Sequence, residues 1–229
     1  MKQFFFLLVF LLLLQNLQAL DIQITGKEAG FDFRGEYNRA LLFLMDFSAF
    51  GVMELNDRYT VKGGLSLGNM EDGVDIKTFT KGGIGPLFGT PLRFDLAYIY
   101  NGLPAYETHT HTLLPVASFN GRWAGIAIGT GLRFTRFFGE PSFFESMLSF
   151  SVYVNFIDKE KLRIGMSWAN FNDFFAGTMG SYSLGLNSAV TLNEQWSLAN
   201  DIELLQSGGG TLAANFYGIV YRGGVRFTW

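Results

Sequence analysis

Two histidines are the residues of this chain best suited to acid–base or metal chemistry. His109 and His111 are its only histidines, they lie two residues apart, and Glu107 comes just before them. Alternate residues of a β-strand share a face, so both imidazoles would point the same way and could hold a metal ion between them. One imidazole could instead be the general base of a lipid-modifying hydrolase or acyltransferase at the rim of a membrane protein.

The sequence leaves both of these histidine sites incomplete. The neighbouring residues are Thr110 and Thr112 rather than a serine nucleophile, and no third metal ligand can be identified. The simpler interpretation treats His109 and His111 as exposed residues at the edge of a loop. The pair is therefore a weak metal candidate, no catalytic residue is assigned, and no cofactor is indicated.

Charged residues of both signs form the second set of residues that could have a functional role. On the alternation described below they share an inward face, where they could line a polar passage that attracts and orients small solutes. The alternative is a closed interior in which the charges pair across strands, because an unpartnered charge in a narrow lumen is costly. The residues predicted to line this interior are Asp32, Arg34, Asp46, Glu54, Lys62, Asp75, Lys77, Lys81, Arg93, Asp95, Arg133, Arg163, Asp201, Glu203, Arg222 and Arg226.

The chain lacks the residues that several other kinds of site require. The chain has no cysteine, which excludes disulfides, thiolate metal sites and a cysteine nucleophile. Its formal net charge is -3, and no basic patch interleaved with aromatic residues indicates nucleic acid as a partner. The glycine clusters at 82–85 and 129–131 lack the lysine and the strand-to-helix context of a phosphate-binding loop.

The beginning of the sequence predicts an exported protein. Lys2 is followed by an unbroken apolar run from Phe4 to Leu14, and the small residue Ala19 lies a few positions later. This is the pattern of a cleavable signal peptide, and the run is too short to cross a bilayer core, which needs about 20 residues. We therefore assign residues 1–19 to a signal peptide and residues 20–229 to the mature domain.

The mature domain is hydrophobic without long apolar runs. After the signal, the longest wholly apolar stretch is Ala40 to Met45, so no membrane-spanning helix is available. Apolar residues account for 48% of the chain and charged residues for 16%, which is unusual for a water-soluble exported domain. Hydrophobic residues spread in this way predict alternation, as in a β-barrel whose outer face meets lipid.

The alternation is visible in many segments. From 123 to 137, one parity is apolar and the other is small or charged, and the same division recurs at 92–100, 148–156, 162–169 and 182–192. A soluble β-sandwich also alternates, but its outward residues should be Lys, Glu and Thr, whereas Gly, Ser and Ala fill the polar parity here. The pattern therefore favours a transmembrane barrel.

Turn residues divide the chain into hairpins. Tight polar turns are predicted at 56–58, 120–122, 158–160 and 193–195, and a looser one at 85–91. More irregular connections are predicted at 35–39, 69–73, 101–107, 138–145, 172–180 and 207–210; we place them outside the cell and the tight turns in the periplasm. The result is an antiparallel up-and-down barrel of twelve strands, with ten or eight as alternatives. The strands are expected near 22–34, 41–55, 59–68, 74–85, 91–101, 108–119, 123–137, 146–157, 161–171, 181–192, 196–206 and 212–229.

The last strand carries a recognisable motif. Arg222, Gly224, Phe227 and Trp229 have the spacing of a polar residue, a glycine two positions later, and aromatic residues three and five positions after that glycine. This resembles the C-terminal assembly signal of bacterial outer-membrane β-barrel proteins. The resemblance implies integration into the outer membrane, contact with its lipids, and assembly by the barrel-assembly machinery; it indicates no subfamily.

The predicted function is that of a small non-enzymatic outer-membrane barrel. It would act as a porin-like channel or transporter for small solutes, or as a structural surface barrel whose connections are too short for a large adhesin domain. The alternative from another class is the lipid-modifying enzyme with His109 or His111 at the outer rim. A binding module whose loops meet a host or phage partner is a third hypothesis, and the sequence does not indicate the oligomeric state.

Overall fold

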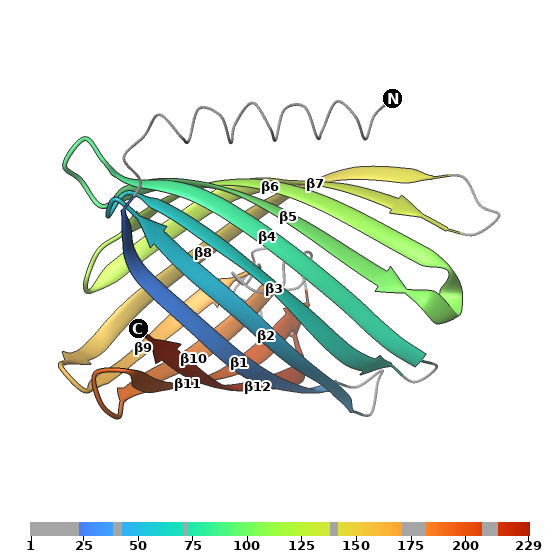
Figure 1. The fold of residues 1–229 in the computed structure, drawn as a ribbon. Helices are drawn as coiled ribbons and strands as arrows, with labels where there is room; N and C mark the ends of the chain where they lie inside the picture. The colour runs from blue at the N-terminus through green and yellow to red at the C-terminus, as the bar shows by residue number, and fades with distance from the viewer. Residues whose placement is uncertain (1–22, 39–42, 71–72, 138–141, 171–181, 208–214) are drawn as a thin grey trace.

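The described residues of the computed structural model form a closed β-barrel. They are residues 23–38, 43–70, 73–137, 142–170, 182–207 and 215–229. Each strand pairs antiparallel with the next in the chain, and the first pairs with the twelfth, so the sheet has no free edge (Figure 1). The prediction of a twelve-stranded up-and-down barrel is confirmed, whereas the predicted signal peptide at 1–19 lies outside the described residues.

The strands are 8 to 17 residues long. Their bounds are β1 Ile24–Asn38, β2 Leu44–Leu55, β3 Tyr59–Met70, β4 Gly73–Leu87, β5 Leu92–Leu103, β6 Thr108–Asn120, β7 Ala124–Arg136, β8 Phe143–Lys159, β9 Leu162–Ala169, β10 Tyr182–Thr191, β11 Trp196–Ser207 and β12 Asn215–Thr228, with a short 3-10 helix, η1, at Pro104–Tyr106.

Some predicted connections are in fact strand. β1 continues to Asn38 through the connection expected at 35–39, and β8 begins at Phe143 inside the one expected at 138–145. β8 also runs on to Lys159 over most of the turn expected at 158–160. The predictions were wrong there because polar residues were taken as turn formers, whereas Glu36, Glu145 and Asp158 each form an ion pair within the barrel.

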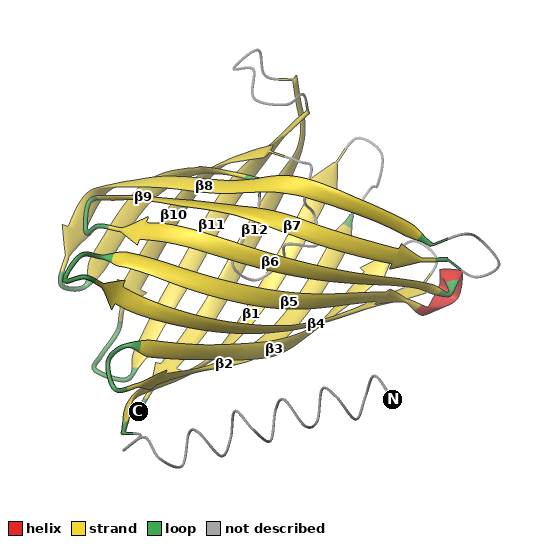
Figure 2. Cartoon of the chain, turned by 90° about the horizontal axis from the view of Figure 1, so that it is seen from above, coloured by secondary structure: helices red, strands yellow, loops and turns green. Residues whose placement is uncertain are grey.

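The two ends of the barrel differ (Figure 2). Tight turns, such as the one at 56–58 between β2 and β3, gather at one end, which we call the turn end. Asn56 and Asp57 both have φ 53°, the left-handed conformation that Asn and Asp tolerate in hairpins. The opposite end, which carries η1, is called the loop end.

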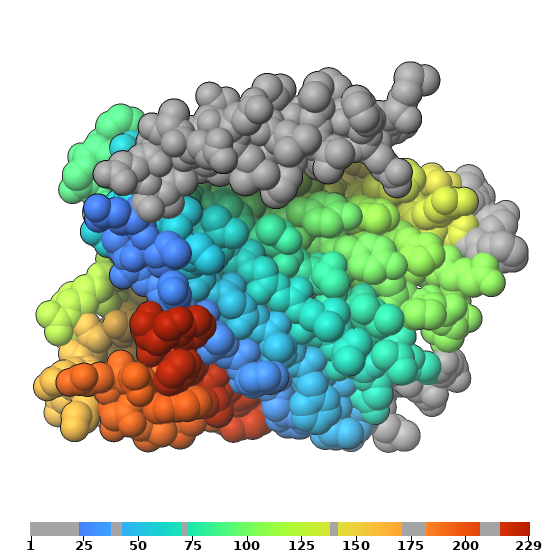
Figure 3. All heavy atoms as spheres, in the orientation of Figure 1, coloured from blue at the N-terminus to red at the C-terminus, as the bar shows by residue number. Residues whose placement is uncertain are grey.

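Side chains alternate between an apolar outer wall and a mixed interior. Phe31 is 71% exposed and Leu148 66%, and Ile126 and Ile128 also face outward as the alternation predicts. An extensive apolar surface of this kind is not sustained in water and is the lipid-facing surface of a transmembrane barrel. Figure 3 shows the side chains of the described strands packed over one side of the barrel. In the described part of the chain, no helix has the length and apolar character needed to span a membrane.

A β-bulge interrupts the alternation near the turn end of β8. Asn155 pairs with Gly165, but Ile157 rather than Phe156 pairs with Ile164. The extra residue shifts the parity, so Asp158 faces its register partner Arg163 on the inner side. A strict two-residue period could not have predicted this pair.

The barrel closes where β1 meets β12, which we call the closing seam. Eleven consecutive residue pairs, from Glu28↔Thr228 to Asn38↔Gly218, align the two strands. Next to this backbone ladder, Arg226 of β12 donates a hydrogen bond from Nη1 to Asp32 Oδ1 of β1 at 2.5 Å. The seam therefore combines main-chain pairing with an ion pair that crosses it.

Gly224 makes room for this ion pair. A Cβ at position 224 would lie 2.0 Å from Asp32 Oδ1 and 2.5 Å from Arg226 Nη1, both far inside van der Waals contact. The folded barrel therefore requires glycine at this position of the motif for steric reasons. Phe227 and Trp229 stack with ring centroids 5.4 Å apart, and Phe227 also packs against Trp196 at 4.7 Å.

Gly224→Ala is expected to destabilise the closed barrel by about 1–3 kcal/mol, because the added methyl group overpacks the seam or breaks the Asp32–Arg226 pair. The check is the temperature at which the folded band of the refolded protein disappears in heat-modifiability electrophoresis. Gly82→Ala is the matched control, since a Cβ there would meet nothing within 4 Å. Equal midpoints for both variants would contradict a steric role of Gly224.

Candidate functional site

The lumen of the barrel contains a first group of ion pairs on β1, β2 and β4 near the loop end. Arg34 donates a hydrogen bond from Nη1 to Asp46 Oδ2 at 2.7 Å and is also paired with Glu36. Lys77 Nζ lies 2.5 Å from Asp75 Oδ2 and 3.7 Å from Asp46 Oδ1. The side chains of Arg34 and Asp46 are 7% and 6% exposed, so these charges are almost fully withdrawn from water.

A second group lies on β11 and β12. Arg222 is paired with both Asp201, at 3.2 Å, and Glu203. Arg222 and Arg34 are register partners across the closing seam, so two arginines stand side by side, each held between two carboxylates. The carboxylates offset the repulsion between the guanidinium groups in a region of low dielectric constant.

Apolar side chains fill another part of the lumen. They form a buried cluster on β2, β4, β5 and β6, made of Phe50, Phe79, Ile99, Leu114 and Val116. Lys62 Nζ lies 4.7 Å from the centroid of the Phe50 ring, and the Arg226 guanidinium lies 4.5 Å from the same centroid. These cation–π contacts join the apolar cluster to the charged residues and hold the side chains of Lys62 and Arg226 against the Phe50 ring.

The described residues line two adjoining cavities in the lumen, of about 1060 Å³ and about 310 Å³. The larger extends to residues at the turn end, including Pro91 and Arg122, and the smaller reaches Arg34 and Arg222 near the loop end. Both are lined by Lys62, Arg163, Asn155, Asn187 and Asp201. The lumen thus has a wide compartment toward the turn end and a tightly packed region toward the loop end.

The structure places the predicted lumen charges in four settings, some of which overlap. Arg34, Asp46, Asp75, Lys77, Asp201, Glu203 and Arg222 belong to the two ion-paired groups, and Asp32 and Arg226 form the pair across the seam. Lys81 pairs with Asp95 at 3.3 Å, Arg133 with Glu145 at 2.8 Å, and Arg93 donates to the Thr60 hydroxyl at 2.6 Å. Glu54, Lys62, Lys81, Arg93, Asp95 and Arg163 line the larger cavity.

Sequence reasoning missed four carboxylates that complete these pairs. Glu28 lies 3.9 Å from Arg226, and Glu36, Glu145 and Asp158 pair with Arg34, Arg133 and Arg163. Glu28 and Glu36 have the same parity as Asp32, so extending the alternation of β1 in both directions would have found them. No sequence signal identified Asp158, because it is the bulge that turns it inward.

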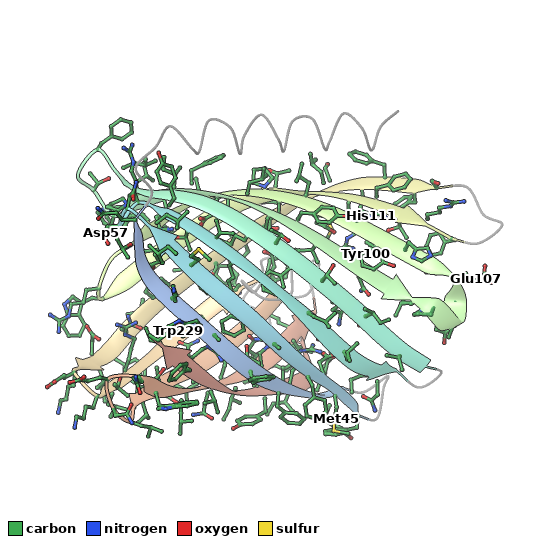
Figure 4. All side chains as sticks on the ribbon, in the orientation of Figure 1. Met45, Asp57, Tyr100, Glu107, His111 and Trp229 are labelled. Carbon is green, nitrogen blue, oxygen red and sulfur yellow. The ribbon has the colours of Figure 1, made fainter. Side chains whose placement is uncertain are left out.

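His109 and His111 share the parity of exposed Leu113 in β6, so both lie on the outer side of the barrel. Figure 4 labels His111. His111 Nδ1 lies 2.8 Å from the hydroxyl oxygen of Tyr98, and His109 Nδ1 lies 2.8 Å from that of Tyr100. Thr110 and Thr112 lie on the opposite face of β6, where Thr112 is 1% exposed, so neither can be a nucleophile for these imidazoles. Among the described residues, no group of three His, Cys, Asp or Glu side chains could hold a metal ion.

Known structures share this architecture. No protein-family model matches the chain, and no curated protein matches it. The structure of the NanC porin superposes with a TM-score of 0.58 at 10% identity, covering 86% of this chain and 98% of that one. The KdgM porin gives a TM-score of 0.55 at 9% identity, covering 87% and 99%. At these identities the similarity shows that the chain has the fold of these porins.

Cysteine substitution can map the lumen, because the chain has no cysteine of its own. Asn187→Cys, in both cavities, should react with a water-soluble thiol reagent at least about ten times faster than Ser66→Cys, whose site is 2% exposed. The measurement is the labelling rate of the refolded barrel in lipid vesicles, followed by mass spectrometry. Labelling of Asn187→Cys as slow as that of Ser66→Cys would show that the larger compartment does not admit solute.

Proposed function

We propose that the protein is a narrow outer-membrane channel for small polar solutes. The observation that carries this proposal is the cavity of about 1060 Å³ inside a closed barrel, lined by charges of both signs. Lys62, Lys81 and Arg93 face it together with Glu54, Asp95 and Glu203. Opposite charges across a narrow lumen create a transverse field that orients dipolar solutes without strongly favouring one sign of ion.

The packed parts of the lumen, near the loop end and midway along the strands, would set the size limit. The ion pairs of Arg34 and Lys77 and the apolar cluster around Phe50 and Phe79 occupy lumen that would otherwise be water. Small solutes would pass beside these groups, whereas large ones would be excluded. A barrel of this size with a partly filled interior suits a selective passage better than a wide general pore.

The similarity to the NanC and KdgM porins supports the channel class. One KdgM structure is described as a complex with disordered oligogalacturonate. We do not extend that ligand to this chain, because its cavity presents carboxylates as well as cations. Small zwitterionic or neutral polar solutes fit this lining better than a polyanion does.

The route to the membrane is part of the same proposal. Export would use residues 1–19, and the barrel-assembly machinery would read Arg222, Gly224, Phe227 and Trp229. The aromatic contacts of Phe227 with Trp196 and Trp229 at the turn end suit a membrane–water interface. The apolar outer wall supports integration among outer-membrane lipids, with the turn end in the periplasm.

Planar-bilayer recording tests the channel. The wild-type barrel should give discrete conductance events in high salt, with weak selectivity between potassium and chloride. Lys62→Glu should shift the cation-to-anion permeability ratio about fivefold toward cations, the equivalent of about 1 kcal/mol for a two-unit change of charge near the path. Lys27→Glu is the control, because Lys27 lies on the outer parity of β1 beside exposed Met53. No events at high salt, with the folded barrel present in the membrane, would refute the proposal.

A further inference from the structure

A polar patch interrupts the apolar outer wall at the loop end of β5, β6 and β7. It consists of Tyr98, Tyr100, His109, His111 and Arg136 and is called the tyrosine–histidine patch. In the strand register His109 pairs with Arg136, and His111 pairs with Tyr100 on its other side. Cross-strand neighbours on one face have Cβ atoms about 5 Å apart, so the five side chains form one continuous surface. Figure 4 shows Tyr100 and His111 toward the end that carries Glu107.

The two tyrosine hydroxyls set the hydrogen-bonding character of the imidazoles. Each Tyr hydroxyl lies 2.8 Å from an imidazole Nδ1, at His111 and at His109. A phenol is the better donor of such a pair and a neutral imidazole nitrogen the better acceptor, so we assign the proton of each ring to Nε2. Both rings then present an N–H donor away from the tyrosines, beside the guanidinium donors of Arg136.

Gly102 allows one of these arrangements. A Cβ at position 102 would lie 2.6 Å from the Tyr100 hydroxyl oxygen and 3.0 Å from its Cζ. The Tyr100 ring therefore lies across Gly102, and a side chain at that position would displace the hydroxyl that reaches His109. The contact between Tyr100 and His109 depends on a specific backbone site, which an incidental surface contact would not need.

The patch lies directly beyond aliphatic wall. On the turn-end side of it, Leu96, Leu113 and Leu132 face outward and are 47%, 40% and 38% exposed. The order along the wall is aliphatic, then tyrosine and histidine with the exposed ring of Phe134 beside His111, then arginine. This order follows the change from acyl chains to headgroups across one leaflet of a membrane.

We propose that the tyrosine–histidine patch binds the phosphate of a lipid headgroup in the outer leaflet. Arg136 would bind two phosphate oxygens through its planar fork, and the two Nε2–H groups would donate to the others. Arg136 has no ion pair with any described residue. Glu107, on the connection between η1 and β6, lies two residues before His109 in the sequence. The proposal rests on the membrane orientation given above but not on conduction.

The two histidines make a direct test feasible, because selective histidine labelling of the whole chain yields two imidazole signals. The refolded barrel in detergent micelles is titrated with bisphosphorylated lipid A, with the same lipid after removal of its phosphates, and with inorganic phosphate. Saturable shifts of both signals with the phosphorylated lipid alone are expected. Equal shifts with the dephosphorylated lipid, or with inorganic phosphate at the same concentration, would overturn the proposal.

Variants separate phosphate binding from general lipid contact. Arg136→Gln is expected to weaken binding of the phosphorylated lipid about tenfold or more, as for the loss of a charge-assisted hydrogen bond. Tyr100→Phe, which keeps the ring but removes the hydroxyl, should weaken it by a smaller factor. Lys27→Gln, which removes an outward cation at the turn end, should leave it unchanged. Wild-type affinity in Arg136→Gln, with the barrel shown to be folded by heat-modifiability electrophoresis, would refute the assignment.

Discussion

Closure of the sheet between β1 and β12 is the constraint on which the rest of this structure depends. A barrel in lipid has no water to satisfy a free edge, so each backbone group there must pair with a neighbouring strand. The closing seam meets this need with continuous pairing from Glu28 to Asn38 and with the Asp32–Arg226 ion pair. Gly224 contributes by having no side chain, because any Cβ would collide with both members of that pair.

The contents of the lumen follow from how this closed wall is filled. Twelve strands enclose more space than their inward side chains occupy, and the filling is uneven. Near the loop end, buried ion pairs take up the volume, and midway along the strands the cluster around Phe50 and Phe79 does so. Toward the turn end, the inward side chains leave the large cavity between them. Paired charges are therefore structural in one part of the lumen and available to solutes in another, so neither interpretation of the interior describes all of it.

The outer wall also follows the alternation of the strands. Positions that face outward in the middle of the strands are aliphatic or aromatic, and near the loop end of β5 to β7 tyrosine, histidine and arginine join Phe134 there. His109 and His111 are thus placed by the alternation of β6 on the face opposite Thr110 and Thr112. The geometry that removes a nucleophile from their reach also gives them tyrosine partners and an outward-facing donor surface.

The sequence by itself determined the strands, their number and the inward or outward direction of most side chains. A two-residue period is a local property that the residues record directly, and Ile126 and Ile128 face outward as it requires. Only the tertiary structure decided which charges meet, because partners such as Asp32 and Arg226 are brought together by closure and not by spacing. It also decided the bulge that turns Asp158 inward and the tyrosines that bind His109 and His111. These features depend on register between strands, and register is fixed by the whole closed sheet rather than by any one segment.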